Sequence, residues 1–132
     1  MTGNCLLIRA DASASRGTGH VMRCLALAHA WQRHGGWAAY LLAERLPELE
    51  QRLTAVGMNI NYLPTDTAVG SPTDAAATID KAKALGAAWL VVDGYDFDSQ
   101  SQQEMKQAGL KLLFLDDFGD LASYPADLIL NQ

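Results

Sequence analysis

The sequence that decides the fold lies between residues 5 and 34 and reads CLLIRADASASRGTGHVMRCLALAHAWQRH. Its first four residues, Cys5 to Ile8, form a short apolar run typical of a buried parallel strand. From Val21 to Trp31 apolar side chains recur at helical spacing. Residues 34–36, His-Gly-Gly, then stop the helix, because glycine takes up the left-handed conformation after a helix end. This stretch therefore predicts a strand, a loop of small residues and a long amphipathic helix.

The rest of the chain continues this alternation. Apolar or alternating runs predict strands at 37–43, 58–63, 89–92, 111–115 and 128–130. A proline at 47, a Ser71-Pro72-Thr73-Asp74 start and a capping-box arrangement at 99–102 predict helices at 47–55, 72–85 and 99–109. Such an alternation predicts an α/β fold: one Rossmann-like, three-layer domain over residues 1–132, with a parallel sheet in the order 3-2-1-4-5-6.

In a sheet of this kind, ligands bind beyond the carboxyl ends of the strands, near the point beside the first strand where the strand order reverses. Asp11 and the loop at 17–20 follow the first predicted strand. Residues 93–95 follow the fourth, and residues 116–117 follow the fifth. We therefore expect the candidate polar residues to converge on one edge of the sheet.

His20 lies at or near the start of the first predicted helix, and neither Gly17 nor Gly19 has a side chain to block approach to it. The positive end of the helix dipole disfavours an imidazolium, so we expect a neutral ring that can accept a proton as a general base. The alternative is that His20 only caps the helix or packs against the loop.

The glycines of this loop do not match the common nucleotide motifs. A dinucleotide fingerprint starting at Gly17 would need its third glycine where Met22 stands, and no Gly-Lys-Ser/Thr follows as in a P-loop. A helix N-terminus can still hold an anion. We expect no cofactor.

Two segments, Ile8-Arg9-Ala10-Asp11-Ala12-Ser13 and residues 17–28 (GTGHVMRCLALA), resemble the N-terminal signature of a known family. It comprises the UDP-2,4-diacetamido-2,4,6-trideoxy-β-L-altropyranose hydrolases of pseudaminic acid biosynthesis, with related spore-coat polysaccharide proteins. Weaker similarity runs through 91–95 and 115–117 to 126–132. Arg16 departs from the pattern, because the family usually has an apolar residue there.

The resemblance implies two Rossmann-like domains in a GT-B-like architecture. This chain would be the N-terminal one, without the C-terminal domain that mainly holds UDP. His20 matches the histidine taken to activate water for inverting hydrolysis at the anomeric carbon. Gly17, Thr18 and Gly19 would face the sugar and phosphate across a cleft. On this reading the partner is a UDP-sugar substrate, and the isolated chain is expected to be inactive or nearly so.

Three further residues are candidates for binding the substrate, each with a structural alternative. Asp11 could orient a neighbour or a sugar hydroxyl, or bond the backbone amides of its own loop. Arg23 could point towards a substrate phosphate or make a structural ion pair, which we favour slightly. Tyr95 resembles a family tyrosine that contacts the sugar, and its alternative is half-buried packing.

Acidic pairs near two strand ends are poor candidates for a metal site. Asp96-Phe97-Asp98 has the Asp-x-Asp spacing of metal-dependent glycosyltransferases, but Asp98 directly precedes a helix, where acids serve the first turn. Asp116 and Asp117 are adjacent in an extended segment and point to opposite faces. We expect no metal.

Composition narrows the class of protein. A net charge of −5 without a basic cluster argues against nucleic acid and anionic membranes as partners. No apolar run approaches the ~20 residues of a membrane span. The N-terminus enters a strand without a secretory leader, and both cysteines lie among apolar residues as buried free thiols would. These features predict a cytoplasmic protein.

The favoured function is therefore the N-terminal domain of a nucleotide-sugar hydrolase in bacterial surface-glycan biosynthesis. The alternatives are the acceptor-binding half of a GT-B glycosyltransferase and a non-catalytic sugar-binding module. The sequence does not specify the exact sugar or the oligomeric state.

Overall fold

Strands and helices alternate along the whole described chain. The computed structural model describes residues 3–12, 17–93, 97–116 and 126–131. The strands within these ranges are β1 (Cys5–Ala10), β2 (Trp37–Leu42), β3 (Asn59–Tyr62), β4 (Ala87–Asp93), β5 (Leu112–Asp116) and β6 (Leu128–Asn131). The helices are α1 (Gly19–Arg33), α2 (Pro47–Ala55), α3 (Pro72–Leu85) and α4 (Ser99–Gln107). Each element occurs where the sequence predicts it, with ends shifted by at most two residues.

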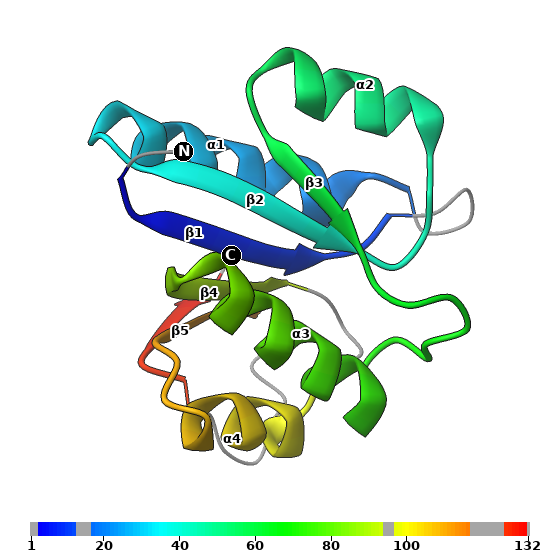
Figure 1. The fold of residues 1–132 in the computed structure, drawn as a ribbon, viewed down its shortest axis with the longest axis vertical. Helices are drawn as coiled ribbons and strands as arrows, with labels where there is room; N and C mark the ends of the chain where they lie inside the picture. Colours follow the sequence, from blue (N-terminus) through cyan, green and yellow to red (C-terminus); the bar gives the residue numbers. More distant parts are fainter. Residues whose placement is uncertain (1–2, 13–16, 94–96, 117–125, 132) are drawn as a thin grey trace.

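The strands form one sheet in the order β3-β2-β1-β4-β5-β6. Every neighbouring pair is parallel. Both the order and the Rossmann-like class are confirmed. The chain runs outward from β1 through β2 to β3 and then crosses back to place β4 on the other side of β1 (Figure 1). The strand order therefore reverses between β1 and β4, where Ala10 lies beside Asp93.

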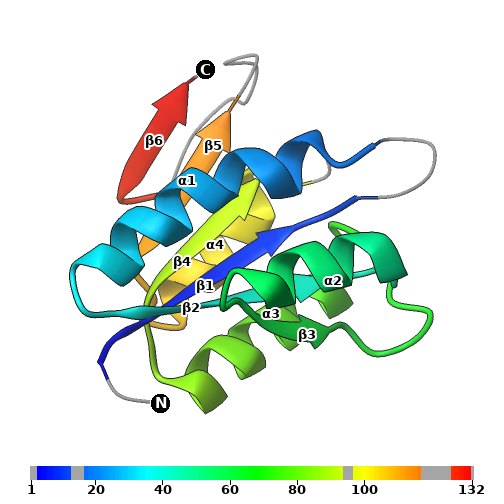
Figure 2. The same cartoon turned by 90° about the horizontal axis from the view of Figure 1, so that it is seen from above.

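Helices cover both faces of the sheet, α1 and α2 on one and α3 and α4 on the other (Figure 2). Alternate residues of β1 point into the two layers: Leu6 and Ile8 pack under α1 and α2, and Cys5 and Leu7 pack under α3 and α4. All six residues of β1 are buried. Burial on both faces explains why the first four residues of this strand read as an unbroken apolar run rather than as an alternation.

Helices α3 and α4 each begin with a side-chain cap, which fixes the segment that leads into the helix at the carboxyl edge of the sheet. The Ser71 hydroxyl accepts a hydrogen bond from the Asp74 amide at 3.1 Å, as predicted, and Gly86 ends α3 in the left-handed conformation. The predicted capping box at 99–102 is wrong by one residue, because Asp98 caps α4: its Oδ1 accepts from the Ser101 amide at 2.9 Å. The extended backbone at Asp98 directs its carboxylate over the first turn of the helix.

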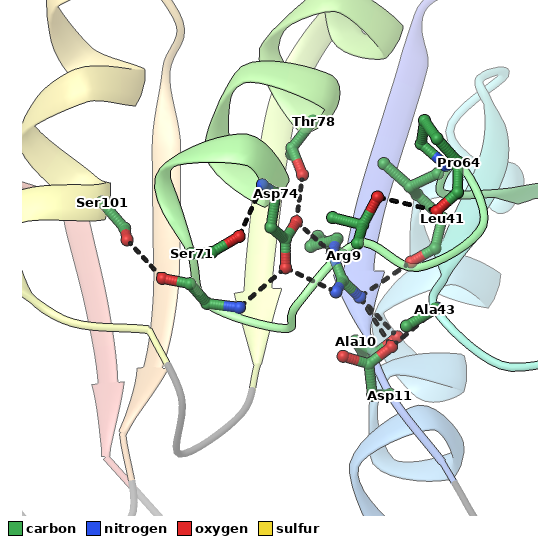
Figure 3. A network of polar contacts seen from close by, with 12 residues as sticks. Arg9, Ala10, Asp11, Leu41, Ala43, Pro64, Ser71, Asp74, Thr78 and Ser101 are labelled. Carbon is green, nitrogen blue, oxygen red and sulfur yellow. Dashed lines mark hydrogen bonds and ion pairs between the residues drawn. The ribbon is translucent and has the colours of Figure 1, made fainter.

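One charged side chain of β1 is fully buried. Arg9 is 0% exposed, and its Nε and Nη2 donate to the two oxygens of Asp74 at 3.0 and 2.8 Å (Figure 3). The Arg9 Nη1 donates to Asp11 Oδ1 at 2.7 Å, and the guanidinium lies 5.2 Å from the centre of the Phe97 ring. Burial alone would lower the pKa of Arg9, but the hydrogen bonds to Asp74 and Asp11 outweigh it and raise the pKa above its ordinary value.

These bonds join segments far apart in the sequence. Asp74 also accepts from the Gly70 amide at 2.9 Å and from the Thr78 hydroxyl at 3.0 Å. Asp11 Oδ1 accepts from the Ala43 amide at 2.9 Å as well as from Arg9. The start of α3 and the segments after β1 and β2 are therefore fixed to a single guanidinium. No helix in the described part of the chain is both long and apolar enough to cross a membrane.

Replacing Arg9 by alanine should destabilise the chain by about 3–5 kcal/mol, because it leaves two carboxylates at the sheet edge without their buried partner. The measurement is urea unfolding followed by circular dichroism. The exposed Arg52 in the last turn of α2 provides a matched control, and Arg52→Ala should change the free energy of unfolding by less than about 0.5 kcal/mol. Equal effects of the two substitutions would contradict this role of Arg9.

Candidate functional site

The candidate site lies where β1 and β4 end and α1 begins. Helix α1 starts at Gly19, with Thr18 as its N-cap residue. The Thr18 side chain makes no capping hydrogen bond, whereas its carbonyl accepts from the Met22 amide at 2.9 Å. His20 is therefore in the first turn of the helix, as the sequence predicts.

Positions 17 and 19, the two glycines before His20, suit glycine for different reasons: the first for its backbone conformation, the second for the space beside it. Gly17 has φ +78°, a conformation that residues with a side chain rarely adopt, so its backbone alone accounts for glycine there. At Gly19, an added Cβ would meet no atom of the described residues within 4 Å. Open space therefore lies beside the turn that carries His20.

His20, Arg23 and Asp93 form one polar cluster. The His20 Nδ1 lies 2.9 Å from Asp93 Oδ1. Arg23 donates from Nε to Asp93 Oδ2 at 2.6 Å and from Nη2 to Asp93 Oδ1 at 2.5 Å. The Asp93 side chain is 0% exposed, that of His20 11% and that of Arg23 23%. A buried carboxylate at the end of β4 thus binds two side chains that reach the surface from one turn of α1.

Cys24 lies beneath this cluster and closes its inner side. Its Sγ is 3.5 Å from Asp93 Oδ2, in position to donate a weak hydrogen bond. Burial, and then the negative charge of Asp93, raise the pKa of the Cys24 thiol far above its usual range. A thiol held in its protonated form is a poor nucleophile, so the chemistry of the cluster belongs to its nitrogen and oxygen atoms.

The sequence allows Asp11 to bond the backbone amides of its own loop. The contacts described for its side chain are instead with Arg9 and with the segment after β2. Its Oδ1 accepts from Arg9 and from the Ala43 amide, which follows β2. Its Oδ2 is buried and has no hydrogen-bond partner among the described residues. One oxygen of Asp11 therefore stabilises the fold, and the other is buried without a hydrogen-bond partner in the described part of the chain.

The other predicted site residues are only partly described. Arg23 makes the ion pair that the sequence analysis favours for it. Tyr95, Asp96 and Asp117 lie outside the described residues. The Asp98 carboxylate caps α4. Across the described ranges, no three His, Cys, Asp or Glu side chains gather as a metal site.

From the sequence alone, Asp93 is expected at the ligand edge, with no role of its own. A signal was present: an acid directly follows the buried run Leu90-Val91-Val92. Val91 packs under α1, so alternation along the strand sends Asp93 to the same side, towards the helix that carries His20. A carboxylate at the buried end of a strand needs donors, and α1 supplies them.

An all-parallel sheet whose strand order reverses between β1 and β4, with helices on both faces, defines a Rossmann-like domain. The crystal structure of MurG from Acinetobacter baumannii is similar to it, with a TM-score of 0.63 and 14% sequence identity. The match covers 98% of this chain and 46% of the MurG chain, so the chain spans about half of that protein. The domain therefore has the fold of one half of a GT-B-like protein. No family model and no curated protein matches the sequence.

Both cysteines should resist thiol reagents in the folded chain. Burial raises the pKa of Cys5 to about 11, so at about pH 8 only about one thiol in a thousand is ionised, and the pKa of Cys24 is also raised. Labelling with a disulfide reagent should be slow in buffer and rapid for both thiols in urea. Fast labelling of Cys24 in the native chain would contradict the packing described for it.

Proposed function

We propose that this chain is the N-terminal domain of a nucleotide-sugar hydrolase that removes UDP from a UDP-linked 2,4-diacetamido-trideoxyhexose, in pseudaminic acid-type biosynthesis in the cytoplasm. The observation that carries the proposal is the position of His20. It lies in the first turn of α1, in contact with Asp93, at the edge where such sheets bind ligands. The GT-B-like fold supports the reading that the sequence resemblance suggests.

In the proposed reaction, His20 accepts a proton from a water molecule. The water oxygen forms a bond to the anomeric carbon, and the bond from that carbon to the diphosphate oxygen breaks with both electrons leaving on UDP. Attack from the side opposite the leaving group inverts the configuration of the sugar. Proton removal by a positioned base contributes about 10²–10⁴-fold to such a rate.

The residues around His20 have supporting roles in this proposal. The sugar and phosphate lie next to the surface formed by Gly17, Thr18 and Gly19. They occupy the space beside Gly19. The buried Oδ2 of Asp11 is the acceptor for a sugar hydroxyl or acetamido N–H. We include Tyr95 as a sugar contact on the strength of the family resemblance.

A second domain would complete the site. The match covers less than half of the MurG chain, and GT-B-like proteins place their substrate between two such domains. We propose that the nucleotide binds mainly to that other domain and that the leaving diphosphate is stabilised there. The domain described here would supply the base and one wall of the sugar site.

An alternative is the acceptor-binding half of a GT-B glycosyltransferase, the class to which the neighbour MurG belongs. In that reaction His20 would deprotonate an acceptor hydroxyl rather than water. A sugar-binding module without catalysis would use the same surface but would not need the imidazole.

The test is UDP release from UDP-linked 2,4-diacetamido-trideoxyhexoses, measured for the full product of the gene, its His20→Asn variant and the 132-residue chain. We expect release by the full product, a fall in kcat of about 10²–10⁴-fold in the variant, and little release by the chain alone. His29→Asn, in the middle of the same helix, is the matched control and should keep its rate.

Each alternative has its own outcome in this assay. Release that needs an added acceptor would replace the hydrolase by the transferase. Unchanged turnover in His20→Asn would remove His20 from the base role. Saturable sugar binding that is unaffected by His20→Ala, without any release, would leave a binding module.

A further inference from the structure

We propose that Asp93 fixes the tautomer and orientation of His20, and that Arg23 holds Asp93 in place for this task. Asp93 and Arg23 are then positioning residues, and His20 is the group that meets the substrate. The catalytic consequence rests on the proposed function, but the tautomer itself does not.

The contact between His20 and Asp93 determines which ring nitrogen of the histidine carries the proton. A carboxylate ion paired with an arginine has no proton to give, so in the 2.9 Å contact with Asp93 Oδ1 the donor is the Nδ1–H of His20. In a neutral imidazole only one nitrogen bears hydrogen. The lone pair that can accept a proton is therefore on Nε2.

The carboxylate of Asp93 is held in place by Arg23 and Cys24. Arg23 binds both oxygens of Asp93, one through Nε and the other through Nη2, so the carboxylate cannot turn about its own axis. Cys24 adds a thiol contact to Oδ2 from the inner side. Asp93 Oδ1 is shared by Arg23 and His20, and its direction towards the imidazole is thereby fixed.

The charge of Asp93 is balanced within the cluster. The Asp93 side chain is fully buried, and one guanidinium balances its single negative charge. Arg23 thus supplies the counter-charge of the carboxylate, and Oδ1 also meets the Nδ1–H of His20. Under the proposed function, Nε2 is the ring nitrogen that acts as the base.

Arg23 supports Asp93 from the same helix that carries His20. It lies three residues after His20, so the two side chains emerge on the same side of α1, one turn apart. Two of its N–H groups are engaged by Asp93. This geometry assigns Arg23 to the support of Asp93.

The experiment is long-range ¹H–¹⁵N NMR of the histidine rings in the 132-residue chain at neutral pH, with the His20 signals assigned from His20→Gln. The nitrogen shifts report directly which ring nitrogen bears the proton. We expect His20 in the wild-type chain to be almost entirely the Nδ1–H tautomer. In Asp93→Asn, we expect that share to fall several-fold, because the pairing with Arg23 is lost and the amide can turn its NH₂ group to the ring.

His29 provides an internal control in the same spectra. Its Nδ1 lies 3.2 Å from Gln32 Oε1, remote from Asp93, and its signals should not change in Asp93→Asn. Circular dichroism reports whether the variant folds, and if it does not, the wild-type spectrum decides. An Nε2–H tautomer for His20 in the wild-type chain would overturn the proposal, as would an unchanged tautomer in folded Asp93→Asn.

These results are separable from those of the activity assay. If UDP release fails to depend on His20 while the tautomer depends on Asp93, the hydrolase proposal fails and this one stands. If release depends on His20 but Asp93→Asn keeps both tautomer and kcat, this proposal fails alone. With both correct, Asp93→Asn should lower kcat at least tenfold and leave KM nearly unchanged, as expected for a residue that acts through the base.

Discussion

The burial of the Arg9 guanidinium is the interaction on which the carboxyl edge of the sheet depends. A charge without water must be matched by partners of good geometry, and Arg9 has Asp74 and Asp11. Those partners belong to the start of α3 and to the end of β1, and Asp11 in turn binds the Ala43 amide after β2. The segments that follow two neighbouring strands are therefore held at fixed positions relative to the start of α3.

The sheet edge carries two ionic clusters with different degrees of closure. Arg9 lies on the face of the sheet covered by α3 and α4, and the side chains of its ion pairs are at most 7% exposed. Asp93 lies on the opposite face, under α1, and both of its basic partners reach the surface. The first cluster has the character of a structural ion pair. The second combines a buried carboxylate with two side chains that reach the surface, and the proposed base is one of them.

The architecture could be predicted from the sequence because it depends on periodicity and on chain punctuation. The apolar runs, the Ser71 cap and Gly86 all act locally, and the parallel order follows from the alternation of strands and helices. The partners of Arg9 and Asp93 could not be predicted in this way. Asp74 lies in the first turn of α3, where an acidic residue is common in any helix. Only the packing of α3 beside β1 makes it the partner of Arg9, 65 residues away. Likewise, His20 and Arg23 meet Asp93 across 73 and 70 residues.

Hydrolysis and glycosyl transfer differ in the oxygen that attacks the anomeric carbon, but both must remove a proton from that oxygen. A tautomer that places the imidazole lone pair on Nε2 serves water and a sugar hydroxyl equally. Under the proposed function, the cluster of His20, Arg23 and Asp93 activates an oxygen nucleophile beside a sugar nucleotide, whichever of the two reactions takes place. The choice between water and an acceptor belongs to whatever surrounds the nucleophile on the other side of the cleft. Under the same proposal, the N-terminal domain keeps its base in either reaction, and the opposite domain determines the product.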